Sequence, residues 1–166
     1  PIPWTDEARE QLGIARVYDL ASVQWMYAEA VSRLAEDTKG PSEKDLAIDI
    51  GSNDGTLLAN YLPHKVRVLG IDPSEAAKLA KEKNVPTLLK FFNAQTAQEI
   101  AAEQGKARVI TATNVFAHVN DLSGFVDGAK GLLTDDGMFI QESHYLRDMI
   151  EHMEYDSIYS EHLRYY

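Results

Sequence analysis

Apolar residues in the first part of the chain recur at steps of three and four, as they do on one face of an amphipathic helix. Between about residues 8 and 36 the positions that share this face are Val17, Leu20, Val23, Tyr27, Val31 and Leu34. Residues 38–42 include adjacent Gly and Pro, which end the pattern. We therefore expect an N-terminal helical segment over residues 1–44.

From residue 45 onward the pattern changes to short apolar runs that alternate with helix-like segments. Strands are predicted at residues 46–50, 66–71, 87–92, 107–112 and 138–142, and helices at residues 56–62, 75–83, 97–104 and 122–133. Strands that alternate with helices pair in parallel through right-handed crossovers, and continuous apolar runs indicate strands covered on both faces. The pattern predicts an α/β fold with a Rossmann-like, doubly wound and mainly parallel sheet over residues 45–143.

Composition narrows the class of protein. The chain has 166 residues, 45% of them hydrophobic, which is enough for one domain with a core. Its 26 acidic and 16 basic residues give a net charge of −10, which disfavours nucleic-acid and anionic membrane partners. With no leader pattern and no apolar run near the roughly 20 residues that span a bilayer, we expect a soluble, cytoplasmic protein. The absence of cysteine rules out disulfides and thiolate metal ligands within this chain.

The loop after the first predicted strand, residues 49–56, has the composition of a ligand-binding turn. Gly51 and Gly55 accept positive φ angles and leave room for a ligand beside the backbone. A dinucleotide-binding loop would have two further glycines, and Asn53 occupies the first of these positions. Because Asn is the non-glycine residue that best enters the left-handed region, the turn is expected to survive there.

Acidic side chains around this loop indicate which ligand it binds. Asp49 and Asp54 flank the loop, and no Lys or Arg is close to them in sequence, so a cofactor with ammonium and sulfonium groups suits it better than a diphosphate. Asp72 ends the second predicted strand 21 positions after Gly51, near the ~20 expected for an acid that binds ribose hydroxyls. The simpler alternative is that the glycines only make a turn and that Asp72 is a solvated strand end. Because the glycine loop and Asp72 lie in one βαβ unit, together they favour cofactor binding.

Three segments together resemble the successive motifs of class I S-adenosylmethionine-dependent methyltransferases. They are Asp49-x-Gly51-x-Asn53-x-Gly55, Gly70-Ile71-Asp72 and Asn114-Val115-Phe116-Ala117-His118-Val119. The resemblance implies that the glycine loop contacts the methionine part of S-adenosyl-L-methionine, that Asp72 binds the ribose diol, and that residues 93–94 lie near the adenine. The cofactor-binding residues that it implies are Asp49, Gly51, Ser52, Asn53, Gly55, Asp72, Pro73, Asn93, Ala94 and Asn114.

The end of the chain, residues 144–166, is polar and aromatic and lacks a clear period. Tyr159, Glu161 and His162 fall in a stretch that closely resembles the Tyr-x-Glu-His-x-x-Tyr segment of deoxysugar C-methyltransferases, which methylate carbon 3 of nucleotide-linked 4-keto sugars. The resemblance implies that His162 is the general base, that Glu161 and Tyr159 assist it, and that His118 is the second active-site histidine. It also implies that the chain is the cofactor-binding middle domain of a larger enzyme, with residues 144–166 beginning a catalytic or linker segment.

The chemistry of carbon methylation accounts for these residue types. Carbon becomes a nucleophile when a proton next to a carbonyl is removed, and histidine is a base of suitable pKa. A carboxylate such as Glu161 can orient the imidazole and stabilise its charged form, and a phenol such as Tyr159 can donate to the developing enolate. This reaction requires no metal, and we expect none; the expected partner is a small-molecule substrate.

Other interpretations of the sequence remain open. His118 could simply cap a loop, and the aromatic tail could be a linker that anchors the next element. The domain could then methylate oxygen or nitrogen of a small molecule, or bind the cofactor without catalysis. A nicotinamide-dependent dehydrogenase is the least favoured, because the loop lacks two of the three fingerprint glycines.

Overall fold

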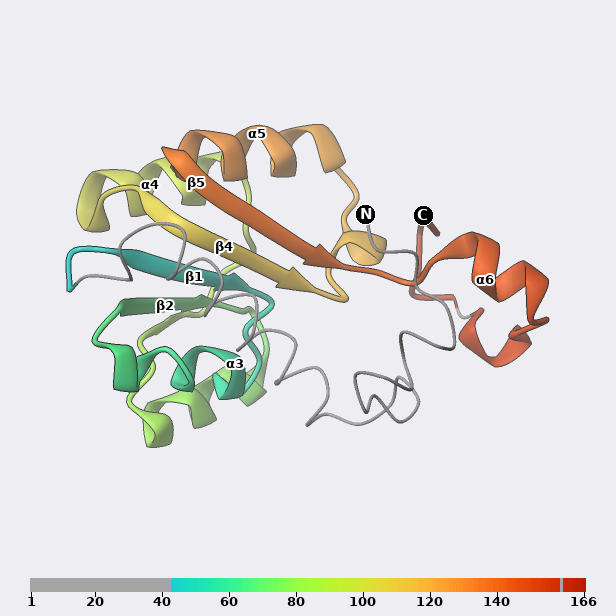
Figure 1. Ribbon diagram of the computed structural model, residues 1–166, viewed down its shortest axis with the longest axis horizontal. Coiled ribbons are helices and arrows are strands. Elements are labelled where there is room, and N and C mark those ends of the chain that lie inside the picture. The colour runs from blue at the N-terminus through green and yellow to red at the C-terminus, as the bar shows by residue number, and fades with distance from the viewer. Residues whose placement is uncertain (1–42, 159) are drawn as a thin grey trace, which may run out of the picture. The chain divides into compact units, whose positions relative to one another are not determined.

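The described part of the chain, residues 43–158 and 160–166 of a computed structural model, contains a sheet with the strand order β3-β2-β1-β4-β5 (Figure 1). All neighbouring strands pair in parallel. The strands are β1 (Leu46–Ile50), β2 (Arg67–Ile71), β3 (Thr87–Leu88), β4 (Ala107–Thr113) and β5 (Leu133–Glu142). The predicted doubly wound parallel sheet is confirmed.

The chain divides into two compact units, Pro1–Pro41 and Ser42–Tyr166, and the description below concerns the second. The helix predicted at residues 8–36 lies outside the described residues, as does Tyr159. No helix among the described residues is long and apolar enough to cross a membrane.

β1 occupies the centre of the sheet. All five of its residues are buried, and it pairs with β2 on one edge and β4 on the other. The sheet grows from β1 through β2 to β3 and then in the opposite direction through β4 to β5. Such a reversal leaves a crevice at the carboxyl ends of the two strands that flank it, here β1 and β4.

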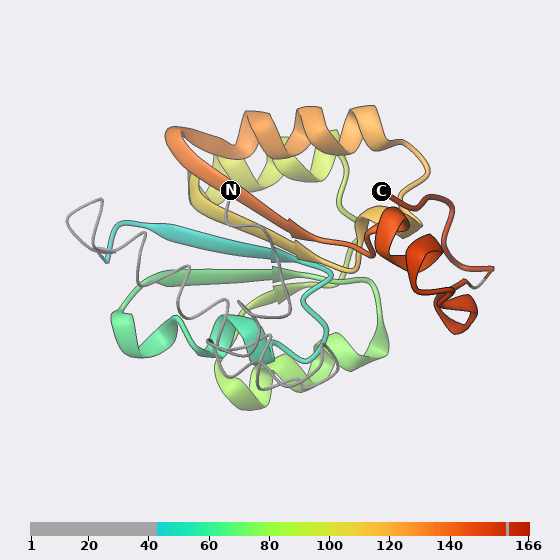
Figure 2. The same ribbon diagram turned by 45° about the vertical axis from the view of Figure 1, so that its right-hand side comes forward.

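Helices cover both faces of the sheet (Figures 1 and 2). In both views α4 and α5 lie on one face, and α3 lies on the other with the 3-10 segments that follow it and β2. The helices are α3 (Thr56–Ala59), α4 (Ala94–Gln104), α5 (Leu122–Leu132) and α6 (Leu146–Glu151), and the 3-10 segments are η1 (Leu62–His64), η2 (Glu75–Lys83), η3 (Phe116–His118) and η4 (Tyr155–Ser157). Asn93 and Asp121 cap α4 and α5, each accepting a hydrogen bond from a backbone N–H three residues on, at 2.9 Å.

Several predicted boundaries are wrong for identifiable reasons. The strand predicted at residues 87–92 ends at Leu88, and Leu89 and Phe91, which follow it, are 52% and 75% exposed, so this apolar run is not core. The helix predicted at residues 56–62 ends at Ala59, shortly before Pro63, whose ring cannot donate to a helical hydrogen bond. β5 starts five residues earlier than predicted, because α5 runs directly into it.

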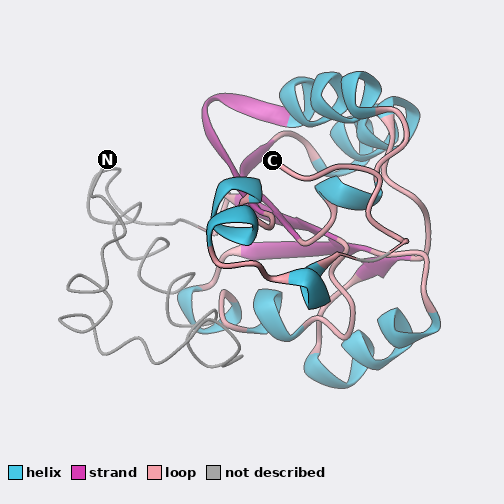
Figure 3. Ribbon diagram, turned by 90° about the vertical axis from the view of Figure 1, so that its right-hand side faces the viewer, coloured by secondary structure: helices cyan, strands magenta, loops and turns pink. Residues whose placement is uncertain are grey.

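A buried aromatic group joins the core to the carboxyl edge of the sheet. Phe116 of η3 lies 5.1 Å from Phe125 of α5, 5.6 Å from Phe139 of β5 and 6.0 Å from Tyr166, measured between ring centroids. Since Phe116 is only two residues before His118, this packing fixes the place of that histidine. The short helix α6, which the sequence pattern does not predict, lies at the same edge, as the view onto the carboxyl ends of the strands shows (Figure 3).

Truncation of a central core residue tests this packing. Ile110 of β4 is fully buried, so Ile110→Ala should lower the free energy of unfolding by about 2–5 kcal/mol. Val126 of α5 is 44% exposed, and Val126→Ala should change it by less than about 0.5 kcal/mol. Urea unfolding of both variants measures the difference, and equal losses would contradict the assignment of Ile110 to the core.

Candidate functional site

The loop after β1 forms a tight turn in the crevice. Gly51 and Gly55 have φ angles of 75°, and Asn53 enters the left-handed region at 50°, as expected from its residue type. A Cβ atom on Gly51 would lie 2.5 Å from Cγ2 of Val115, so the loop after β4 rests directly on the glycine loop. The two loops that flank the crevice are therefore in contact.

Five backbone donors of the glycine loop form hydrogen bonds within the chain. Gly51 N and Ser52 N donate to Ile71 O at 2.8 and 3.4 Å, Asn53 N donates to Asp72 Oδ2 at 2.9 Å, Gly55 N donates to Ser52 O at 2.9 Å, and Thr56 N donates to Asp54 Oδ1 at 3.1 Å. A diphosphate site needs several free N–H groups that point at the ligand. These hydrogen bonds thus disfavour a dinucleotide more directly than charge does.

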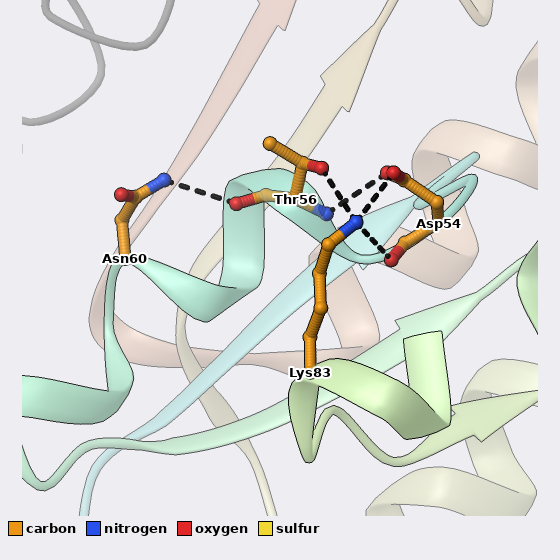
Figure 4. A network of polar contacts seen from close by, with 4 residues as sticks. All are labelled: Asp54, Thr56, Asn60 and Lys83. Carbon is orange, nitrogen blue, oxygen red and sulfur yellow. Dashed lines mark hydrogen bonds and ion pairs between the residues drawn. The ribbon is translucent and has the colours of Figure 1, made fainter. Parts of the chain in front are cut away.

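The expectation of an acidic loop with no basic partner is wrong for Asp54. Lys83, at the end of η2, donates to Asp54 Oδ2 at 2.5 Å, to Asp54 O at 3.2 Å and to Thr56 Oγ1 at 2.9 Å (Figure 4). The hydrogen bond from Lys83 is the main cause that lowers the pKa of the Asp54 carboxyl. Asp54 therefore secures the start of α3, and the acidity of the site comes from Asp49 and Asp72.

Asp72 is not a solvated strand end. Its side chain is only 7% exposed, and its two oxygens accept hydrogen bonds from Asn53 N at 2.9 Å and Ser74 N at 2.7 Å. Each carboxylate oxygen keeps a further lone pair. This geometry fixes a carboxylate at the end of β2, where it can accept hydrogen bonds from a diol.

Asp49 is buried in β1, with 4% of its surface exposed. Burial raises the pKa of the Asp49 carboxyl to about 7; a hydrogen bond from Thr111 Oγ1, at 2.5 Å, opposes this rise, and the charge of Asp72 adds to it. A cation close to Asp49 would favour the ionised form. The side chain therefore suits a positively charged ligand group.

The remaining candidates for cofactor binding differ in their burial and in whether their polar groups already form hydrogen bonds. Ser52 is buried, and its Oγ finds no hydrogen-bond partner in the described part of the chain. Asn93 Oδ1 is used to cap α4, Pro73 is exposed two residues after the end of β2, and Ala94 is exposed as the first residue of α4. Asn114 has a φ angle of 55°, and its backbone N–H donates to Glu142 O at 3.0 Å.

Two of the predicted catalytic residues lie in contact. The rings of His118 and His162 are 4.9 Å apart between centroids, although 44 residues separate them in sequence. His118 Nδ1 lies 3.0 Å from Glu161 O, whereas the Glu161 side chain is exposed. The structure thus brings His118, Glu161 and His162 together at the carboxyl edge of the sheet.

Two further residues of this cluster were not among the predicted catalytic residues, although Tyr165 is the last tyrosine of the motif in the tail. The ring of His144 lies 5.2 Å from that of His162, and the ring of Tyr165 lies 5.4 Å from it. His144 comes two residues after β5 ends, and this position at a strand terminus is the signal that could have indicated it. The described residues contain no group of three or more His, Asp or Glu side chains arranged to hold a metal ion.

Hydrogen bonds from the backbone and side chains of the tail attach it to backbone carbonyls of the loop after β4. Leu163 N donates to Ala117 O at 2.7 Å, and the Tyr166 hydroxyl donates to Phe116 O at 3.2 Å. Arg164 donates to the carbonyls of Val119 and Asn120. His162 is therefore held by its neighbours on both sides, with 8% of its surface exposed.

A family model described as a methyltransferase domain matches residues 21–166 of the chain. The chain belongs to this methyltransferase domain family. The prediction of a class I S-adenosylmethionine-dependent methyltransferase fold is confirmed, because the order of the described strands and the position of the glycine loop agree with family membership.

Individual relatives of the methyltransferase domain agree with this assignment. The C-methyltransferase NovU from Streptomyces niveus is 34% identical over 128 residues, which cover 76% of this chain and 30% of NovU. The structure is similar to the plantazolicin methyltransferase BpumL in complex with SAH, with a TM-score of 0.61, 22% identity, and coverage of 83% of this chain and 52% of that one. It is also similar to a SAM-dependent methyltransferase from Archaeoglobus fulgidus, with a TM-score of 0.58, 13% identity, and coverage of 82% and 62%. The domain thus spans about a third to about two thirds of the length of these relatives.

The buried carboxyl of Asp49 makes the stability of the methyltransferase domain depend on pH. Between the ordinary pKa of 3.8 and the raised value of about 7, the folded protein holds a proton that the unfolded chain has released, so stability falls as pH rises. Asp49→Asn can still accept the Thr111 hydrogen bond and carries no charge. Its gain in free energy of unfolding should grow by about 1.4 kcal/mol per pH unit up to about pH 7 and then level off. Urea unfolding from about pH 5 to about pH 8 measures this gain; a gain that does not vary with pH would contradict it.

Proposed function

We propose that this domain methylates a carbon next to a carbonyl group, in a nucleotide-linked keto-deoxysugar, with S-adenosyl-L-methionine as the methyl donor. The observation that carries the proposal is the position of His162, which lies against His118 at the crevice of a methyltransferase fold. The 34% identity to a C-methyltransferase supports carbon as the methyl acceptor.

The residues of the crevice fit the cofactor. When bound, S-adenosyl-L-methionine supplies an electrophilic methyl group on a sulfonium centre. Asp72 is fixed by two backbone donors and would accept hydrogen bonds from the ribose diol, while Asp49 would lie on the side of the cationic methionine part. The buried hydroxyl of Ser52, which has no hydrogen-bond partner among the described residues, is consistent with a ligand close to the backbone. The exposed residues Asn93 and Ala94 would lie near the adenine.

His162 would act as the general base. Burial lowers the pKa of the His162 imidazole, the charges of His118 and His144 lower it further, and Glu161 opposes them. A neutral imidazole can take the proton from the carbon next to the carbonyl, which makes that carbon nucleophilic. Because Nδ1 of His162 is buried, the proton would be taken at Nε2.

Two groups would then stabilise the charges that form. Glu161 lies next to the imidazolium and favours its charged form. Tyr159, which lies outside the described residues, would donate a hydrogen bond from its hydroxyl group to the enolate oxygen. The close packing of the tail on the loop after β4 would exclude water from the base.

Replacement of Asp72 tests the cofactor site. Asp72→Asn should weaken binding of S-adenosylhomocysteine by about ten- to a hundredfold, because a hydrogen bond to a charged group is lost. Asp127→Asn, an equal change of charge at an exposed position of α5, should leave the affinity unchanged. Titration calorimetry measures both. Equal affinities for the two variants, or no binding by the unmodified protein, would contradict the proposed cofactor site.

Replacement of His162 tests the base separately from the methyl donor. In deuterated water a base next to the carbonyl exchanges the proton of the 4-keto sugar for deuterium, which proton NMR follows. His162→Gln should slow this exchange by about a hundredfold or more, and calorimetry should show unchanged binding of S-adenosylhomocysteine. Unchanged exchange and turnover would instead favour methylation of oxygen or nitrogen, with a tail that serves only structure.

A further inference from the structure

His144 is a histidine in the cluster for which the proposed chemistry gives no role. It lies in the turn between β5 and α6, partly buried, and its ring is 5.2 Å from that of His162 at an interplanar angle of 50°. The His118 ring approaches the same imidazole at 4.9 Å and 74°. The three histidines come from three separate segments, the end of η3, the β5–α6 turn and the tail.

We propose that His144 is a positioning residue for His162, packing against the ring of the base so that this ring is held beside His118 at the carboxyl edge of the sheet. The proposal rests on the proposed function of His162 as a base and extends it to a residue on a different segment. The tail backbone is fixed at Leu163 and at Tyr166, and the rings of His118, His144 and Tyr165 bear directly on the ring of His162.

The contact also acts through charge. Each imidazole takes up a proton near pH ~6.5 when isolated, and two positive charges about 5 Å apart repel one another. The groups that face His162 are His118 from η3, His144 from the β5–α6 turn, and Glu161 and Tyr165 from its own segment. Burial is the largest cause that lowers the pKa of His162, followed by His118 and then His144, while Glu161 raises it.

This arrangement keeps the base free of a proton under mildly acidic conditions. Positive charge at His118 or His144 disfavours the charged form of His162 and so lowers its pKa. The rate would then persist to lower pH than an ordinary histidine base allows. The rings therefore set the position of the base and also its protonation state.

Titration of the histidine rings by NMR tests the proposal without any methyl transfer. The probe is the protein with isotope-labelled histidine, as wild type and with His144→Gln, His144→Phe and His64→Gln. We expect the protonation midpoint of His162 to move to higher pH in both His144 variants and to stay in place in His64→Gln, because His64 is exposed and lies in η1.

The activity of the same variants separates packing from charge. At about pH 8, well above the ordinary histidine pKa of ~6.5, His144→Gln should lower kcat by about tenfold or more. His144→Phe should restore most of it through its ring, and the affinity for S-adenosylhomocysteine should stay unchanged. An unchanged His162 midpoint in both His144 variants overturns the proposal, and so does wild-type kcat in His144→Gln. Failure of the proposed function is distinguishable, because it is seen as unchanged proton exchange in His162→Gln, whatever the His144 variants do.

Discussion

β1 forms hydrogen bonds along both of its edges, with β2 on one side and β4 on the other, and the rest of the structure depends on this pairing. The strand is buried throughout, so its register is fixed and its carboxyl end lies beside those of its two neighbours. Each of the three strands delivers one part of the site. β1 ends in the glycine loop, β2 ends in Asp72, and β4 leads to His118.

Two buried carboxyl groups are held at fixed positions in the site, although their negative charges repel one another. Asp49 and Asp72 are both buried at the carboxyl ends of adjacent strands, and the charge of Asp72 adds to the rise in the pKa of Asp49. Asp72 is balanced by two backbone donors, whereas Asp49 has a hydroxyl partner only. Without a ligand, the domain thus contains a carboxyl group, that of Asp49, whose ionisation a cationic ligand would favour. Ligand binding is therefore coupled to the stability of the domain.

The sequence predicts the parts of this arrangement that local patterns control. The bounds of β1 and the left-handed turn at Asn53 follow from apolar runs and residue types, and the motif resemblance pairs His118 with His162. Lys83 could not be predicted as the partner of Asp54, because 29 residues separate them and only the packing of η2 beside α3 brings them together. His144 was missed because only the fold brings it into contact with His162, although its place just after β5 was a signal in the sequence. The prediction of a strand at residues 87–92 failed because this apolar run continues past Leu88 into residues that the fold leaves exposed.

The tail closes on itself. Leu146 N donates to Tyr166 O at 2.5 Å, so the segment that carries the proposed base leaves the sheet and returns to almost the same point. Between these two residues it touches the core mainly through the loop after β4. A segment joined in this way can be exchanged for another of different length and composition while the strands and the glycine loop stay as they are. Evolution could thus alter which molecule is methylated independently of how the methyl donor is held.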